Sequence, residues 1–143
     1  MTAARPALSE FPIHAKLKLS ALWISAMFCF IYADYFGLYV PGRLQSMLDG
    51  RIGPLGPTTQ GVLLGTSVTM AIPSLMIVLS LVLGPRPNRV INMVVGALYT
   101  AITLLTMWRW AFYVFFGAIE VVLTGLVIWY AWKWPRDPAE PRG

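Results

Sequence analysis

The stretch that decides the fold is FYVFFGAIEVVLTGLVIWYAW, residues 112–132, in which Glu120 is the one charged side chain. A helix needs about 20 apolar residues to cross the hydrocarbon core of a bilayer, and this stretch has that length. A carboxylate inside hydrocarbon costs roughly 2.5–3.5 kcal/mol, so it persists where neighbouring protein or water interacts with it. The stretch therefore predicts a membrane-spanning helix that directs Glu120 toward other helices.

Three further apolar stretches of similar length precede it, at about residues 19–38, 59–83 and 90–107. The chain of 143 residues is 57% hydrophobic and 12% charged, and its mean hydropathy is +0.66. No polar segment is long enough to form a soluble core of its own. We therefore expect one integral membrane domain over residues 1–143, an all-α, antiparallel bundle of four transmembrane helices.

The positions of the basic residues predict how the chain is threaded. The proline-containing residues 84–88 predict a tight turn between the second and third stretches. Eight of the 11 Lys and Arg residues lie in the N-terminal tail, this second-to-third connection or the C-terminal tail. The positive-inside rule then places both termini, with tails at residues 1–17 and 134–143, in the cytoplasm. Although the net charge is +5, the basic residues lie at the ends of apolar stretches rather than on one polar face. We therefore expect no nucleic-acid partner.

The first outer connection, residues 39–58, is the only long one, and Thr58 or Thr59 is expected to cap the helix that follows it. Within it, residues 41–50 predict a short helix that proline starts and glycine ends. Leu44, Met47 and Leu48 share one face of this helix, which is typical of an amphipathic helix lying flat on the membrane surface. A cap packed on the mouth of the bundle is equally compatible with this pattern.

Small residues recur at helical spacing within all four stretches. In the third, Asn92, Gly96 and Thr100 form a row at steps of four, and Asn92 is expected to form a hydrogen bond between helices. Because lipid provides little hydrophobic drive between helices, association depends on close backbone approach across small residues. In the fourth stretch, Gly117, Glu120 and Thr124 alternate steps of three and four, which directs Glu120 into the bundle. We predict helix packing, within the chain or between subunits, at a set of small residues: Ser25, Cys29, Ala33, Gly37, Gly61, Gly65, Gly96 and Gly117.

The polar residues of the outer half form the candidate functional site. At a rise of 1.5 Å per residue, Asp34 lies about 6 Å below the outer end of its helix, whereas Glu120 lies about 12 Å below, near the middle of the membrane. Gln60 and Tyr113 are expected at the level of Asp34, and Thr124 is expected beneath them with Glu120. These five side chains are the candidate site for a proton or another small substrate.

Two interpretations of the acids are open. The functional one is a proton or cation relay, or a small polar cavity open to the outside. The structural one is an interhelical clamp: hydrocarbon favours the neutral carboxyl, so Glu120 is protonated and donates a hydrogen bond to Thr124 or to a neighbouring helix. In that case Asp34 is wetted near the surface and paired with an outer arginine: Arg43, Arg51 or Arg109.

No catalytic constellation emerges from the sequence. The one cysteine, Cys29, and the one histidine, His14, exclude an internal disulfide, a redox cysteine pair and a bis-histidine haem. The sequence also has no nucleophile–histidine pair, metal-ligand cluster or phosphate-binding loop. We therefore expect no metal, no cofactor and no enzymatic activity, which disfavours a membrane enzyme acting on lipid.

Two functional hypotheses remain. In the first, the chain forms a homo-oligomeric transporter or channel-like protein that moves protons, cations or a small solute with its intramembrane carboxyls. In the second, it is a non-catalytic accessory or assembly subunit that binds a larger membrane complex through its small-residue faces. The expected partners are membrane lipids and either a second copy of the chain or another membrane subunit.

Several blocks of sequence carry a family resemblance. They are LSALWI at residues 19–24, YAD at residues 32–34, TQGVLLG at residues 59–65 and IWYAWKW at residues 128–134. In these blocks the chain resembles an uncharacterised family of small bacterial four-helix integral membrane proteins, a domain of unknown function. The resemblance covers about residues 17–134 and implies a four-helix topology in the bacterial cytoplasmic membrane. It implies no activity, so no functional residue is carried over from it.

Overall fold

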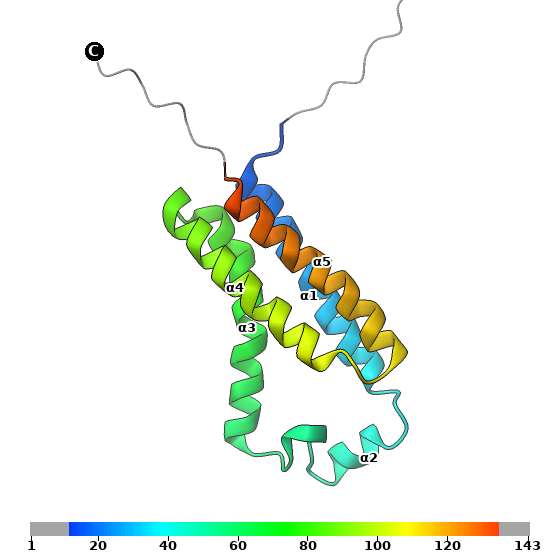
Figure 1. The fold of residues 1–143 in the computed structure, drawn as a ribbon. Coiled ribbons are helices and arrows are strands. Elements are labelled where there is room, and N and C mark those ends of the chain that lie inside the picture. The colour runs from blue at the N-terminus through cyan, green and yellow to red at the C-terminus, as the bar shows by residue number, and fades with distance from the viewer. Residues whose placement is uncertain (1–11, 135–143) are drawn as a thin grey trace, which may run out of the picture.

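The computed structural model describes residues 12–134, which are helical apart from short connections (Figure 1). The four long helices are α1 (Ala15–Gly37), α3 (Gln60–Val82), α4 (Pro85–Thr106) and α5 (Ala111–Trp132). Each is long and apolar enough to cross a membrane. This confirms the predicted all-α membrane protein with four spans. The predicted tails, residues 1–17 and 134–143, lie largely outside the described residues.

The connection between α1 and α3 contains the helix α2 (Arg43–Leu48) and the 3-10 helix η1 (Gly53–Leu55). The sequence predicted one helix over residues 41–50, and α2 is its central part. Gly42 has a φ of 78°, a left-handed conformation outside the helical range, so α2 begins only after it. The apolar face predicted for this helix is exposed at all three positions, Leu44, Met47 and Leu48. It is therefore not packed on the bundle, which favours the membrane-surface interpretation over the cap.

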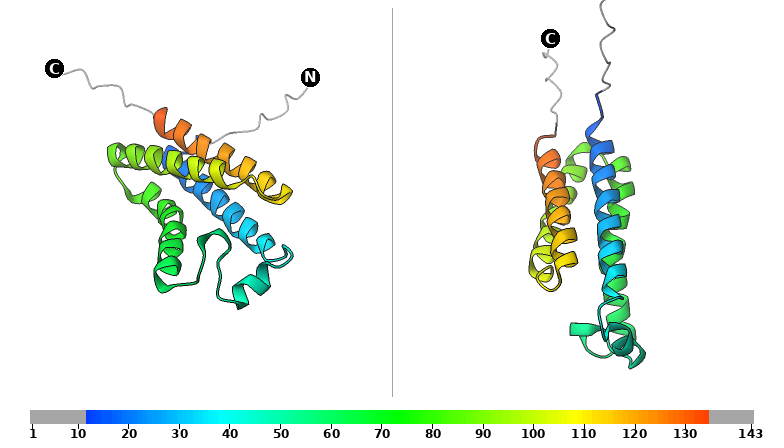
Figure 2. Two further views of the ribbon diagram at one scale, coloured as in Figure 1. Left: turned by 60° about the horizontal axis from the view of Figure 1, so that its bottom comes forward. Right: turned by 90° about the vertical axis from the view of Figure 1, so that its right-hand side faces the viewer.

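The long helices form two layers. α1 and α3 make one layer, α4 and α5 make the other, and α5 packs closely against both α1 and α4 (Figure 2). The start of α1, the end of α5 and the turn between α3 and α4 lie together at one end, which we call the terminal end (Figure 1). The segment with α2 and η1 lies at the opposite end, the loop end. Toward the loop end α3 diverges from α4, and these two helices contact each other little.

The start of α4 differs from the prediction. Residues 84–88 were expected to form a turn before a helix from residue 90, but α4 begins at Pro85. The first N–H groups of a helix have no partner within it, so Pro85 and Pro87 fit the first turn without losing a hydrogen bond. By contrast, the start of α3 was predicted correctly, because the Thr59 side chain accepts from the Val62 N–H at 3.2 Å.

A buried hydrogen-bonded network closes the terminal half. We call it the amide network: Trp23, Ser80, Asn88 and Asn92, each 0% exposed. Trp23 Nε1 of α1 and Ser80 Oγ of α3 both donate to Asn92 Oδ1 of α4, at 2.7 and 3.2 Å. Asn92 Nδ2 donates to Asn88 Oδ1 at 2.7 Å, and Asn88 Nδ2 donates to the Ser80 carbonyl at 2.7 Å. Three helices are thus joined by polar groups that satisfy one another, which is the form in which polar groups are tolerated inside a membrane.

A second polar link lies nearer the middle of α3. Pro73 has no N–H, so the carbonyl of Thr69 lacks the donor that a helix normally provides four residues later. The hydroxyl of Tyr99, on α4, donates to this carbonyl instead. The Thr69 hydroxyl donates to the Gly65 carbonyl at 2.9 Å, so it does not replace the missing donor. The break in α3 is therefore satisfied by α4.

Candidate functional site

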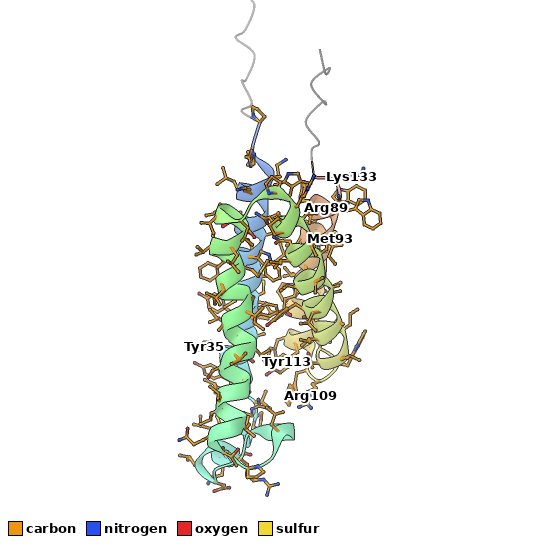
Figure 3. The ribbon with its side chains drawn as sticks, turned by 90° about the vertical axis from the view of Figure 1, so that its left-hand side faces the viewer. Tyr35, Arg89, Met93, Arg109, Tyr113 and Lys133 are labelled. Carbon is orange, nitrogen blue, oxygen red and sulfur yellow. The ribbon has the colours of Figure 1, made fainter. Side chains whose placement is uncertain are left out.

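A cavity of about 320 Å³ lies in the loop half of the molecule. Side chains of α1, α3, α4 and α5 form its walls, and residues of α2 and of the connection that follows it contribute at the loop end. Its charged lining consists of two acids and two arginines: Asp34, Arg43, Arg109 and Glu120. Figure 3 shows Arg109 and Tyr113 at this end, whereas Arg89 and Lys133 lie at the terminal end. We call this space the loop-end cavity.

Glu120, which the sequence predicted as a site residue, lines the cavity. It lies on α5, is 6% exposed, and accepts a hydrogen bond at Oε2 from Thr103 Oγ1 of α4 at 3.1 Å. The two helices approach closely here, because a Cβ at Gly117 would lie 2.7 Å from Met107 Cβ and 3.3 Å from Thr103 Cγ2. The missing side chain of Gly117, one helical turn before Glu120, thus allows the carboxyl to reach its partner.

Thr103 and Tyr99 were missed by the sequence analysis. The predicted row on this helix followed steps of four, from Asn92 to Gly96 and on to Thr100. The buried face of α4 instead mixes steps of four and three, and alternates them only from Asn92 onward: Asn88, Asn92, Gly96, Tyr99 and Thr103. The alternation of three and four that predicted the inward face of α5 would also have found these residues on α4.

The expected bond between the Glu120 and Thr124 side chains is not formed. Thr124 is fully buried and does not line the cavity. Its hydroxyl donates to the main-chain carbonyl of Glu120 at 2.8 Å and lies 2.7 Å from the hydroxyl of Thr100. A threonine hydroxyl within a helix readily reaches the carbonyl four residues earlier, so it bonds to the backbone rather than to the carboxyl.

The predicted outer polar layer is only partly assembled. Asp34 and Tyr113 line the cavity, and Tyr113 packs directly against Gly37 of α1. Gln60 is exposed at the start of α3 and is not part of the cavity wall. The physical reason is that α3 diverges from α4 toward the loop end, which carries Gln60 away from the other polar residues.

The charged groups of the cavity are not paired with one another. Among residues 12–134, no direct ion pair joins Asp34 to Arg43, Arg51 or Arg109. The Asp34 side chain is exposed, which agrees with the wetted carboxylate of the structural interpretation but not with its ion pair. Arg43 Nε is buried and has no hydrogen-bond partner. The guanidinium of Arg43 is held against the connection, because a Cβ at Gly53 would lie 2.9 Å from Arg43 Nη1.

The predicted helix-packing residues fall into two groups. Ala33, Gly37, Gly96 and Gly117 are buried between helices of the chain, and Cys29 is half-buried. Three others are exposed: Ser25, Gly61 and Gly65. Nothing lies within 4 Å of the position that a Cβ would take at Gly65. The small-residue face of α3 thus has no neighbour among the described helices at that point.

The site can bind a small molecule with charged ends and can exchange a proton at a carboxyl. Apart from its charged groups, the lining is mostly apolar and aromatic, including Phe30, Tyr99 and Tyr113. Within residues 12–134, no group of three or more His, Cys, Asp or Glu side chains is placed to hold a metal ion. The Ser and Thr hydroxyls of the described range have no histidine beside them that would make a nucleophile.

Comparison with known proteins places the chain in a family without assigning an activity. Neither a curated protein nor a solved structure matches it. The model of one family, DUF6326, a family of unknown function, matches residues 8–140. This match covers all four spans and confirms the resemblance to an uncharacterised family. The chain therefore belongs to the DUF6326 family.

Proposed function

We propose that this membrane protein is a small transporter that binds a solute in the loop-end cavity and exchanges a proton at Glu120. The observation that carries the proposal is the contrast along the bundle. A cavity with charged walls reaches Glu120 from the loop end, whereas the amide network fills the terminal half. This arrangement corresponds to one of the two states of an alternating-access cycle, with the site accessible from one side only.

Two features of the cavity wall support this proposal. Glu120 is buried, accepts one side-chain hydrogen bond and has no cation paired with it among the described residues, so its proton can be exchanged with a solute or with water. Thr69, whose carbonyl Pro73 frees from its own helix and which accepts instead from the Tyr99 hydroxyl, also lines the cavity. Transporters commonly bind their substrates where spanning helices are broken in this way.

We propose further that the loop end faces the outside of a bacterial cell and the terminal end faces the cytoplasm. Lys16, Lys18, Arg86, Arg89 and Lys133 all lie at or near the terminal end. The positive-inside rule places such a concentration of basic residues on the cytoplasmic side. The cavity would then receive its solute from outside. In this account the protein acts without a cofactor and without a covalent step.

The test of this function is proton movement in proteoliposomes. With an imposed membrane potential and an internal pH indicator, the wild-type chain is expected to admit protons when a panel of small solutes is added outside. Glu120→Gln keeps the size of the side chain but cannot release a proton, so proton entry should be lost. Asp49→Asn, at an exposed acid outside the cavity, serves as the matched control and should transport normally. Unchanged proton entry in a folded Glu120→Gln protein would contradict the proposal.

The exposed small residues of α3 favour a second candidate, association with a second copy or with another membrane subunit. Gly61 and Gly65 are exposed, and α3 is the long helix with the smallest buried share. Helices associate in lipid across such residues. Gly65→Leu should then weaken a complex detected by crosslinking in membranes, whereas Gly84→Leu, in the α3–α4 turn, should not. Equal crosslinking in both variants would contradict this candidate.

A further inference from the structure

The loop-end cavity combines charges of both signs that do not pair with each other. Asp34 and Arg43 line the same space, and no ion pair joins them within residues 12–134. Arg43 Nε is buried without a hydrogen-bond partner. Buried donors in proteins are nearly always satisfied, and an arginine is satisfied best by an anionic oxygen. Because Arg43 also lines the cavity, its guanidinium is the group that we assign to an anionic part of a ligand.

Asp34 lines the same cavity and calls for the opposite charge on the ligand, a cationic group. A cationic nitrogen beside its carboxylate would complete an ion pair that the protein itself does not make. A ligand with only a positive charge would leave Arg43 without an acceptor and would also meet Arg109. A ligand with only a negative charge would meet the carboxylate of Asp34 without a cationic group to pair with it. Only a ligand that carries both charges can form an ion pair with Asp34 and with Arg43 at the same time.

The other residues that line the cavity indicate the size and polarity of the uncharged part of the ligand. Phe30, Met70, Tyr99, Ile102 and Met107 contribute apolar or aromatic surface. Aromatic rings also attract a cationic nitrogen through their faces. The volume of about 320 Å³ lies at the lower end of the range for ligand sites, which restricts the ligand to a small molecule or to one group of a larger one.

We infer that the loop-end cavity binds a zwitterion: an anionic oxygen group beside Arg43, a cationic nitrogen beside Asp34, and an apolar body against Phe30 and Tyr99. This inference rests on the proposed function, since it names the class of solute. The same chemistry has two sources. One is a free amino acid with an apolar side chain. The other is the headgroup of an ethanolamine phospholipid, because Met70 of α3 and Leu105 of α4 line the cavity and are exposed, Leu105 by 83%.

The test compares three probes that share one apolar body. Leucine carries both charges, 3-methylbutylamine carries only the positive one, and 4-methylpentanoate carries only the negative one. Binding is measured by thermal stabilisation and tryptophan fluorescence of the full chain in nanodiscs of phosphatidylglycerol, which has no amine. Phenylalanine, glycine betaine and nanodiscs that contain phosphatidylethanolamine complete the panel of zwitterions. At least one zwitterion should bind about tenfold more tightly than either singly charged probe.

Variants then locate the binding. Arg43→Gln and Asp34→Asn should each weaken binding of the zwitterion about tenfold or more. Arg51→Gln and Asp49→Asn change the same residue types in the α1–α3 connection but outside the cavity wall, so they should leave binding unchanged. Binding of leucine identifies a free solute, whereas stabilisation by phosphatidylethanolamine alone identifies the lipid headgroup. The comparison of probes on the wild-type chain needs no variant, so it holds even if a variant fails to fold.

The inference is overturned if a singly charged probe binds as tightly as every zwitterion, or if no zwitterion of the panel binds. Its failure is distinct from that of the proposed function. Zwitterion binding without proton entry in proteoliposomes would contradict the proposed transport function but support the zwitterion as the class of ligand. Proton entry driven by 3-methylbutylamine or by 4-methylpentanoate, but by no zwitterion, would remove the ligand class and leave the function.

Discussion

The terminal half and the loop half of this bundle both hold polar side chains inside the membrane. These side chains bond to one another in the terminal half but are largely unpaired in the loop half. In the amide network, Trp23, Ser80, Asn88 and Asn92 are fully buried and bond to one another across three helices. In the loop-end cavity, Asp34 and Arg43 share a wall without pairing, and Glu120 accepts from Thr103 alone among the described side chains. Polar groups that satisfy one another fix the fold, whereas those left open are available for a ligand or a proton.

The helix contacts follow the same division. In the terminal half, α3 and α4 are joined through Ser80, Asn88 and Asn92. Toward the loop end they diverge, and the hydrogen bond from Tyr99 to the Thr69 carbonyl joins them beside the cavity. The comparison therefore predicts that breaking the amide network causes the largest loss of stability, and that removing a polar group of the loop-end cavity costs little. Four substitutions test this division.

The largest effect is expected for Asn92→Leu. The change keeps a similar volume but leaves Trp23 Nε1 and Ser80 Oγ, both fully buried, without their acceptor. Each buried group without a partner costs about 1–3 kcal/mol, so the free energy of unfolding should fall by about 3 kcal/mol. Ser67→Ala is the control, because this exposed hydroxyl bonds only to the Leu63 carbonyl of its own helix. Reversible unfolding in mixed detergent micelles measures both, and equal stabilities would contradict a structural role for the network.

The next effect separates the two groups of small residues. Gly117→Ala places a methyl group 2.7 Å from Met107 Cβ and should lower the free energy of unfolding by about 1–3 kcal/mol. Gly65→Ala meets nothing within 4 Å and should change it by less than about 0.5 kcal/mol. The same unfolding assay compares the two variants. A large loss of stability in Gly65→Ala would show that the exposed face of α3 is packed against another chain.

A smaller effect is expected at the break in α3. Tyr99→Phe removes the donor to the Thr69 carbonyl and should cost about 1 kcal/mol. Pro73→Ala returns an N–H to α3, so the carbonyl regains a donor from its own helix. Tyr99→Phe should then cost less in the Pro73→Ala background than in the wild type, and a double-mutant cycle measures this difference. Additive effects would mean that Tyr99 does not replace the missing donor.

The smallest effect is expected for Thr103→Val, which removes the hydroxyl that bonds to Glu120 Oε2. Single hydrogen bonds between membrane helices contribute on average about 0.6 kcal/mol, so the loss of stability should be of that size. Thr106→Val is the matched control, because its hydroxyl bonds to the Ile102 carbonyl of its own helix at 2.8 Å. The unfolding assay should show a larger loss of stability for Thr103→Val than for Thr106→Val. A loss of several kcal/mol in Thr103→Val would assign Glu120 to the structural part of the molecule.

The sequence was sufficient for features that depend on local composition and spacing. Apolar length predicted the four spans, the Thr59 cap predicted the start of α3, and the alternating steps around Glu120 predicted that this carboxyl faces into the bundle. Asn92 was also expected to form a hydrogen bond between helices, and it does.

Features that depend on how two helices diverge or approach were not predicted. Gln60 was placed beside Asp34 because both lie at outer helix ends, but the divergence of α3 separates them. Thr103 and Tyr99 were missed because a strict step of four was applied to a helix whose buried face mixes steps of four and three. The start of α4 was missed because prolines were read as a turn, although they are accommodated in a first helical turn.

The division of the bundle is tested most directly by the reactivity of two positions on one face of α1. Ala33 lines the cavity and is 7% exposed, whereas Ala26, about two helical turns away, is 0% exposed and outside the cavity wall. With Cys29 replaced by alanine, Ala33→Cys and Ala26→Cys are each exposed to a small charged thiol reagent in sealed vesicles. We expect rapid modification at position 33 from the loop side and none at position 26. Equal modification of both positions, or modification at position 26 alone, would contradict an open loop half above a closed terminal half.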